Sequence, residues 1–260
     1  MILNAEVKPK KFLGQHFLTN KNIAIRIAEI AKKGNHQNML EIGPGMGVLT
    51  EHLIDSSIHL KAIEIDTESV AFLKRKFTNL EVIEGDFLKI DILALFDDDE
   101  FAVVGNFPYN ISSQIVFKIL ENRNLIPYMA GMFQKEVAER IGAKPGSKDY
   151  GILSVLTQLF YDVEYHFTVE PGNFNPPPKV RSGVISLKRL ESQLCSDAEY
   201  EQVKYLVKTA FNQRRKTLRN ALKSLNIPAE LLKDSIFDRR AEQLSPSEFV
   251  ELSKAVALAH

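Results

Sequence analysis

The sequence has few of the features that mark secreted, metal-binding or membrane proteins. Cys195 is the only cysteine in 260 residues, which excludes an internal disulfide and a cysteine-rich metal site and suits a reducing cytosol. The six histidines show no ligand spacing, and no apolar run approaches the ~20 residues of a membrane span. Residues 1–12 carry lysines but lack the apolar stretch of a signal peptide. We therefore expect a cytoplasmic protein without a metal or a membrane anchor.

Basic and acidic side chains are equally numerous, with 33 of each, so the formal net charge is zero. This balance gives no indication of a nucleic-acid partner, so only the local distribution of charge along the chain can indicate one. The apolar fraction of 45% is ordinary for a globular protein, and 260 residues are enough for a full α/β domain and a small second domain.

The segment FAVVGNFPYNISS at residues 101–113 is a short apolar run that ends in a polar and aromatic tetrapeptide. Such a run predicts a buried parallel strand, and ligands of open α/β sheets lie beyond the carboxyl ends of these strands. The tetrapeptide consists of Asn106, Phe107, Pro108 and Tyr109. The Asn106 oxygen can accept from an amino group, Pro108 fixes the backbone so that a neighbouring carbonyl can accept too, and Tyr109 offers a face for stacking. These groups fit the edge and face of a flipped-out adenine or cytosine, although an ordinary Asn/Pro turn could have the same sequence.

The segment MLEIGPGMGVL at residues 39–49 predicts a strand that runs into a Gly-rich turn, followed by a helix at 50–54. Gly43, Gly45 and Gly47 permit positive φ and a close approach of the backbone to a ligand, and the helix start presents unpaired N–H groups. The turn departs from the G-x-G-x-x-G fingerprint because position 48 is Val, which weakens a nicotinamide interpretation.

Two further predicted strands end in acidic residues. The segment HLKAIEID at 59–66 carries Glu64, about 20 residues after Gly43, where a carboxylate can accept both hydroxyls of a bound ribose. The next strand, LEVIEGD at 80–86, ends in Asp86, which could accept from an adenine amino group while Phe87 packs on the ring. A single carboxylate at a strand end is more often a helix cap, but these strand ends in order, together with the Asn106 tetrapeptide, favour a nucleoside site.

The segment VKPKKFLGQHFLTN at residues 7–20 is basic, then Gly-containing, then aromatic, and Asn20 is a candidate cap of the following helix. It is either a lid over the site or a basic arm packed on the domain.

Phe174 immediately precedes the proline-rich run NPPPKV at residues 175–180. Prolines hold an extended loop rigid, so Phe174 is either a fixed aromatic wall of the site or core filler. Elsewhere the pattern predicts helices at 133–141 and 150–160, and strands at 163–169 and 184–190 that could form a hairpin closing the sheet.

After Leu190 the pattern is helical only, so we expect a domain at 1–190 and a second one at 191–260. Residues 202–229 contain no acidic residue and seven basic ones, namely Lys204, Lys208, Arg214, Arg215, Lys216, Arg219 and Lys223. In a continuous helix Lys216, Arg219 and Lys223 would share one face. Such a run is either a solvated face or a contact with RNA phosphates.

These segments, in this order and spacing, resemble the ribosomal RNA adenine dimethyltransferase family over nearly the whole chain, and within it the members that act on the small subunit. The similar segments are GQHFL, EIGPGMGVLT, IEID, GDFL, NFPYNISS, NPPPKVRS and AFNQRRKTLRNAL. The resemblance implies an α/β, Rossmann-like S-adenosylmethionine-dependent methyltransferase domain with a small all-helical C-terminal domain. It also implies conversion of two neighbouring adenines near the 3′ end of small-subunit ribosomal RNA to N6,N6-dimethyladenine.

The resemblance assigns roles to residues and implies S-adenosylmethionine as cofactor, S-adenosylhomocysteine as product, and no metal. The expected cofactor-binding residues are His16, Leu18, Gly43, Gly45, Glu64, Ile65, Asp86, Phe87 and Asn106. The expected catalytic residues are Asn106, Phe107, Pro108, Tyr109 and Phe174. The expected RNA-binding residues are Lys10, Lys11, Arg214, Arg215, Lys216, Arg219 and Lys223. The sequence departs from the family pattern at His16, often Asn, and at Phe107, often Leu.

The expected partner is small-subunit ribosomal RNA within a pre-30S particle, with no membrane and no obligate protein partner. Three alternatives remain: a large-subunit ribosomal RNA adenine methyltransferase of the macrolide-resistance type, a non-catalytic RNA-binding relative, and a nicotinamide dehydrogenase. The dehydrogenase leaves the Asn106 tetrapeptide and the basic helical region without a role, and the presence of Asn106 favours an enzyme over a non-catalytic relative.

Overall fold

The computed structural model describes residues 7–258, which form two compact units. The first comprises the described residues up to Ala138 together with Val163–Arg189, and the second comprises Glu139–Asp162 together with the described residues from Leu190 onward. The expected boundary at 190 therefore coincides with one junction, but residues 139–162, assigned to the first domain from the sequence, lie with the second unit. Hydrogen bonds within that unit explain the difference, since the Gly146 N–H donates to the Glu242 carbonyl at 2.7 Å and Tyr150 packs against Phe211.

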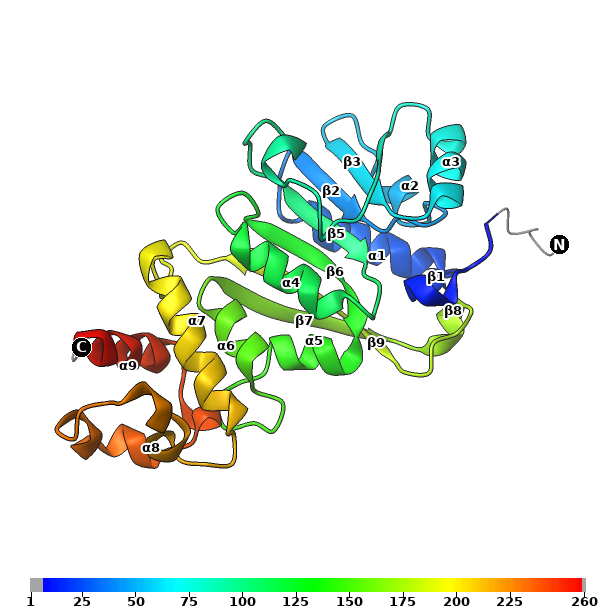
Figure 1. Ribbon diagram of the computed structural model, residues 1–260. Helices are drawn as coiled ribbons and strands as arrows, with labels where there is room; N and C mark the ends of the chain where they lie inside the picture. The colour runs from blue at the N-terminus through cyan, green and yellow to red at the C-terminus, as the bar shows by residue number, and fades with distance from the viewer. Residues whose placement is uncertain (1–6, 259–260) are drawn as a thin grey trace. The chain divides into compact units, whose positions relative to one another are not determined.

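A seven-stranded sheet of order β4-β3-β2-β5-β6-β9-β7 is the centre of the fold (Figure 1). Strands β2 to β6 are parallel to their neighbours, and β9 is antiparallel to β6. The strands are β2 Asn38–Ile42, β3 His59–Glu64, β4 Glu81–Glu84, β5 Ala102–Asn106, β6 Tyr128–Gln134, β7 Tyr161–Val169 and β9 Ser182–Arg189. The predicted strands are confirmed, and β7 and β9 are neighbours at one side of the sheet as the hairpin hypothesis requires.

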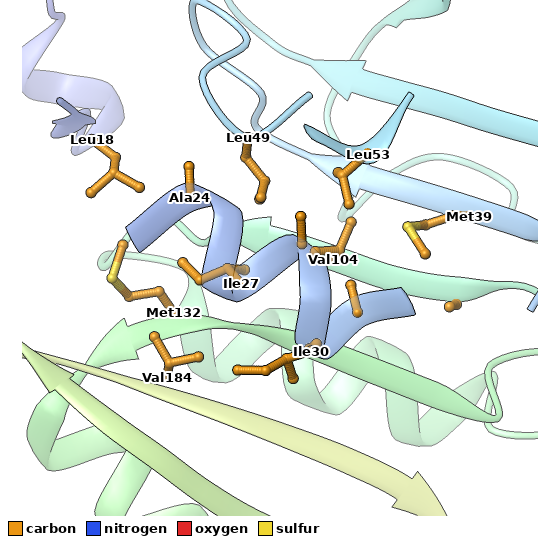
Figure 2. Packing of buried hydrophobic residues seen from close by; sticks show 14 of the residues in the cluster. Leu18, Ala24, Ile27, Ile30, Met39, Leu49, Leu53, Val104, Met132 and Val184 are labelled. Atoms are coloured by element: carbon orange, nitrogen blue, oxygen red, sulfur yellow. The ribbon is translucent and has the colours of Figure 1, made fainter. Parts of the chain in front are cut away.

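Helices of the first unit cover the sheet and bury its apolar faces. Asn20 caps α1 by accepting from the Asn22 N–H at 3.0 Å, which confirms the predicted start of that helix. Ile27 and Ile30 of α1 join Val104 and Met132 of the sheet in one buried apolar cluster (Figure 2). The remaining helices of this unit are α2 Thr50–Leu53, α3 Thr67–Lys76 and α4 Ser112–Glu121, with α1 spanning Lys21–Lys32. Short 3₁₀ turns occur at η1 Lys11–Leu13, η2 Leu93–Leu95 and η3 Pro171–Asn173.

The N-terminal segment is fixed to the proline-rich loop by a small two-stranded sheet. β1 (Phe17–Leu18) pairs antiparallel with β8 (Phe174–Asn175), so that Leu18 lies opposite Phe174. The Thr19 N–H donates to the Asn173 carbonyl at 2.8 Å, which extends the pairing. The described part of the arm is therefore packed on the first unit.

The second unit is helical. Its helices are α6 Ile152–Gln158, α7 Asp197–Asn212, α8 Leu218–Ala221 and α9 Pro246–Leu258. Shorter 3₁₀ turns lie at η4 Lys223–Leu225, η5 Leu231–Lys233, η6 Ser235–Asp238 and η7 Ala241–Gln243. The helix predicted at 150–160 is confirmed as α6, whereas the helix predicted from 133 begins at α5 (Lys135–Ile141) because β6 continues to Gln134. The continuous helix expected through the basic run is wrong, since α7 ends at Asn212 and a turn separates it from α8.

None of the helices within residues 7–258 is long and apolar enough to cross a membrane.

Candidate functional site

A cavity of about 560 Å³ lies in the first unit, at the carboxyl ends of β2, β3 and β5. Residues that immediately follow or end these strands line it, as parallel α/β sheets favour. Ten of the residues predicted from the sequence are among its lining, namely His16, Leu18, Gly43, Gly45, Glu64, Ile65, Asn106, Phe107, Pro108 and Tyr109.

The Gly-rich turn forms one wall and has the backbone conformation that the glycines predict. Gly43, Gly45 and Gly47 have φ of 66°, 57° and 76°, a region that side-chain-bearing residues rarely adopt. A Cβ at Gly45 would lie 2.9 Å from the ring of Phe17, so the arm also presses closely on this turn. The turn therefore needs glycine for conformation and for space.

Glu64 closes the tip of β3 and is held by backbone donors. Its carboxylate accepts from the Gly45 N–H at 3.0 Å and from the Asp66 N–H at 2.9 Å, one bond to each oxygen. The side chain is buried, and burial raises its pKa, although backbone hydrogen bonds from Asp66, Gly45 and Ile65 oppose that shift. Each carboxylate oxygen can accept a second hydrogen bond, so the group can still bind hydroxyls.

Glu41, which the sequence analysis missed, is a second buried carboxyl on the cavity wall. The Thr50 hydroxyl donates to its Oε2 at 2.6 Å. Burial raises the pKa of Glu41 to about 8, and the nearby negative charge of Glu64 adds to the increase. A carboxyl group inside the apolar strand MLEI was the available signal, because a buried acid in a core strand needs a specific reason.

Asn106 ends β5 with its amide orientation fixed. Its Nδ2 donates to the backbone carbonyl of His16 at 3.0 Å, which leaves Oδ1 as the group that can accept from a ligand. The Pro108 carbonyl accepts from the Ile111 N–H at 3.2 Å, within the turn. Among the described residues no amide donates to the Phe107 carbonyl, which is therefore the backbone acceptor next to Asn106.

Tyr109 and His16 form an aromatic pair at the cavity. Their ring centroids are 5.4 Å apart with an interplanar angle of 29°, and the Tyr109 hydroxyl is 2.6 Å from the Ser182 hydroxyl. His16 is fixed in turn, since its Nδ1 lies 2.8 Å from the Pro176 carbonyl. The ring assigned to the cofactor by resemblance thus packs on the tyrosine assigned to the base.

Phe107 points into the core and anchors the tetrapeptide. Its side chain is 1% exposed and packs on Phe133 with centroids 4.8 Å apart. Two glycines make room for it, since a Cβ at Gly131 would lie 2.3 Å from its ring and one at Gly105 would lie 3.0 Å from it.

Three predicted site residues do not line the cavity. The Asp86 carboxylate accepts from the Leu88 N–H at 3.0 Å, a local turn contact, and Phe87 is buried with Lys118 Nζ 5.3 Å from its ring centroid. Phe174 is 4% exposed and belongs to the core cluster with Leu18. Of the two alternatives for Phe174, its position is that of core filler and not of an aromatic wall, because pairing of β8 with β1 turns its side chain into the core.

Several basic residues predicted to bind RNA are engaged in ion pairs. Lys10 is paired with Asp66 and Glu68, whereas Lys11 is exposed. In the second unit, Arg214 is 2.9 Å from Glu242, and Arg219 is 2.7 Å from Asp238. The acids that compensate these arginines lie outside residues 202–229 and escaped the local charge count. Three predicted cations of that unit are exposed and make no ion pair within the described chain, namely Arg215, Lys216 and Lys223.

Within residues 7–258 no group of three or more His, Cys, Asp or Glu side chains is arranged to hold a metal ion.

Comparison with known proteins gives the affiliation of the chain. Residues 6–257 match the family described as ribosomal RNA adenine dimethylase. The chain belongs to this family. The family is one of ribosomal RNA methyltransferases, so the protein is an enzyme.

Relatives and solved structures agree with the family. The chain is 54% identical to a protein of Flavobacterium johnsoniae named ribosomal RNA small subunit methyltransferase A, over 96% of this chain and 97% of that one. A protein of the same name from Cytophaga hutchinsonii is also 54% identical, over 97% and 98%. The fold of the present chain matches a dimethyladenosine transferase from Plasmodium falciparum with a TM-score of 0.79 and 30% identity, over 91% of this chain and 96% of that one. It also matches the 23S ribosomal RNA methyltransferase ErmE with a TM-score of 0.74 and 26% identity, over 93% and 99%. These matches establish a Rossmann-like methyltransferase fold with a helical C-terminal region.

Proposed function

We propose that the protein transfers methyl groups from S-adenosylmethionine to N6 of two adjacent adenines in the 3′-terminal hairpin loop of small-subunit ribosomal RNA, giving N6,N6-dimethyladenine. The observation that carries the proposal is the pair of fixed acceptors, Asn106 Oδ1 and the Phe107 carbonyl, beside a cavity at the carboxyl edge of the sheet. The 54% identity to proteins named as small-subunit methyltransferases, over nearly the full length of the chain, supports the choice of RNA.

The cavity fits a nucleoside cofactor with a cationic group. Gly43 has φ of 66°, and a Cβ there would stand 3.7 Å from the Pro108 ring, so its absence leaves a cradle for a ligand. Glu64 is a buried carboxylate whose free lone pairs suit the two hydroxyls of a ribose. Glu41 adds a second buried carboxyl, which its raised pKa keeps mostly protonated near neutral pH and which a nearby cationic ligand would help to ionise.

S-adenosylmethionine, when bound, supplies a methyl group that is already activated. The residues of this chain prepare the acceptor, because the adenine amine is a poor nucleophile whose lone pair is delocalised into the ring. Asn106 Oδ1 and the Phe107 carbonyl accept from its two N–H groups, which favours a pyramidal nitrogen and stabilises the positive charge that develops on it. Tyr109 holds the flipped base by stacking, a contact worth roughly 1 to 3 kcal/mol.

RNA docking falls to the second unit in this proposal. Arg215, Lys216 and Lys223 are exposed cations there, and phosphate contacts of this kind position an RNA without reading its sequence. The substrate proposed is a pre-30S particle, in which the folded RNA presents the correct loop. We also propose that Asp86 and Phe87 contact the cofactor and that Lys11 contacts the RNA.

The proposal is tested by incubating the protein and S-adenosylmethionine with small-subunit particles that lack the modification, then mapping dimethyladenine by mass spectrometry of the RNA. We expect two adjacent dimethyladenines, far less product with Asn106→Ala over the same incubation, and none in large-subunit RNA. Methylation of large-subunit RNA instead would favour the macrolide-resistance type, which the more similar relatives do not support.

A further inference from the structure

Phe12 is an exposed phenylalanine at the edge of the cavity. Its side chain is 79% exposed, and it is the only phenylalanine within residues 7–258 that is more than about a third exposed. It lies in η1, and the two residues that follow it, Leu13 and Gly14, both line the cavity. An exposed phenylalanine leaves its apolar surface in water, which costs the folded state the gain that burial would give.

The turn that carries Phe12 is anchored on both sides. On one side, Lys10 is paired with Asp66 and Glu68, and its N–H donates to Gln15 Oε1 at 2.7 Å. On the other side, Gly14 has φ of 66° and packs so closely on Asn110 that a Cβ would lie 2.7 Å from Oδ1. The Gly14 N–H closes the turn on the Lys11 carbonyl at 3.0 Å. Phe12 is therefore held in a defined position rather than on a loose end.

Two exposed lysines closely precede Phe12 in the chain. Lys8 and Lys11 are exposed, and neither makes an ion pair with another described residue, whereas Lys10 is ion-paired with two acidic residues. An exposed aromatic ring next to unpaired lysines is the combination that proteins use to bind single-stranded nucleic acid, since the ring stacks on a base and the lysines neutralise phosphates. A lone exposed apolar residue without this charge would carry no such meaning.

We propose that Phe12 stacks on a base of the RNA next to the adenine that is being methylated, with Lys11 contacting an adjacent phosphate. The inference rests on the proposed function, because it requires a nucleotide in the cavity whose RNA strand passes over the rim at Leu13 and Gly14. A base removed from its stack exposes the face of its neighbour, and Phe12 replaces the lost stacking partner there. Phe12 is thus a determinant of RNA positioning that acts outside the cofactor cavity.

The test compares Phe12→Ala, Phe12→Leu and Phe12→Trp in the full chain, with unmodified small-subunit particles as substrate. Alanine and leucine should raise KM for the particle roughly tenfold, whereas tryptophan should keep it within about twofold, because stacking needs an aromatic face and not apolar bulk. Affinity for S-adenosylmethionine should be unchanged in all three. Leu93→Ala is the matched control, since it removes another exposed apolar side chain, 55% exposed, that does not line the cavity.

A second measurement identifies what Phe12 touches. A photoreactive benzoylphenylalanine placed at position 12 should crosslink to RNA within a few nucleotides of the target adenines. Crosslinks confined to ribosomal proteins, or a Phe12→Leu variant with the KM of the wild type, would overturn the inference. If the wild-type protein itself failed to methylate the particle, the proposed function would fail instead, so the two failures are distinguishable.

Discussion

At the scale of single residues, Glu41 ties the cavity to the stability of the fold. Its pKa is about 8 in the folded protein and near 4.5 in the unfolded chain, so the folded state holds an extra proton between these values. The free energy of unfolding should therefore fall as pH rises from about 5 to 8, by up to about 1.4 kcal/mol per pH unit from this group.

Glu41→Gln tests this linkage, because glutamine resembles the protonated acid and can still accept from Thr50. Urea unfolding between pH 5.5 and 7.5 should show the variant gaining stability relative to the wild type as pH rises. Other titrating groups are common to both proteins and cancel in the difference. Parallel stability curves would mean that Glu41 ionises normally in the fold.

Asn106 tests the proposed chemistry at the same scale. Asn106→Ala should lower the single-turnover methylation rate roughly 100- to 1,000-fold, as loss of one preorganised hydrogen bond to a developing charge does. Affinity for the particle should change much less, because the Asn106 oxygen acts on the reacting amine. The two quantities are measured separately by rapid quench and by filter binding. A variant that loses particle binding but keeps its rate would refute the assignment.

At the scale of elements, the place where β5 and β6 meet positions the tetrapeptide. Gly131→Ala would put a Cβ 2.3 Å from the Phe107 ring and 2.6 Å from the Gly105 carbonyl, so ring or strand must move. We expect the free energy of unfolding, measured by calorimetry, to fall by roughly 1 to 3 kcal/mol, and the methylation rate to fall as well. Gly172→Ala is the matched control, since nothing lies within 4 Å of its added Cβ. Adding Phe107→Leu should recover part of the loss, and simple additivity of the two changes would contradict the proposed clash.

The elements were predictable where local pattern decides them. β2 and β5 are apolar runs stopped by glycine or a polar residue, and Asn20 is a cap that the sequence displays. β6 has no counterpart among the predicted strands, because Ala130 and Gly131 lower its intrinsic strand preference, and burial and pairing with β5 and β9 stabilise it. The expected helix across the basic run fails because periodicity does not reveal the turn after Asn212.

In the candidate site, too, the features set by local pattern and topology were predictable, and those set by distant contacts were not. Glu64 and Asn106 lie at strand ends, so their convergence follows from parallel topology. The positions of Phe174 and Lys10 depend on partners about 156 and 56 residues away, Leu18 and Asp66, and spacing along the chain gives no information on such contacts.

At the scale of the whole molecule, ion pairing separates the basic residues of 202–229 into those that stabilise the second unit and those that are available to bind RNA. Arg219 donates to the Leu232 carbonyl at 2.6 Å and lies against Asp238, so it stabilises the second unit from within. Arg215, Lys216 and Lys223 remain exposed and are available for phosphates. The charge count over residues 202–229 treats all of them alike because it ignores acids elsewhere in the chain.

The last prediction changes only the exposed cations, in the combined variant Arg215→Gln, Lys216→Gln and Lys223→Gln. With fewer phosphate contacts, fewer counterions are released when the variant binds. The slope of log affinity for the particle against log salt should therefore become shallower by about two to three. S-adenosylmethionine affinity should stay normal, because the cavity residues all belong to the first unit. Lys33→Gln, Lys74→Gln and Lys188→Gln together make the control, since they remove the same charge from exposed lysines at other positions. Equal slopes for the two triple variants would mean that net charge alone governs binding, and the docking surface would then have to be sought on the arm at Lys8 and Lys11.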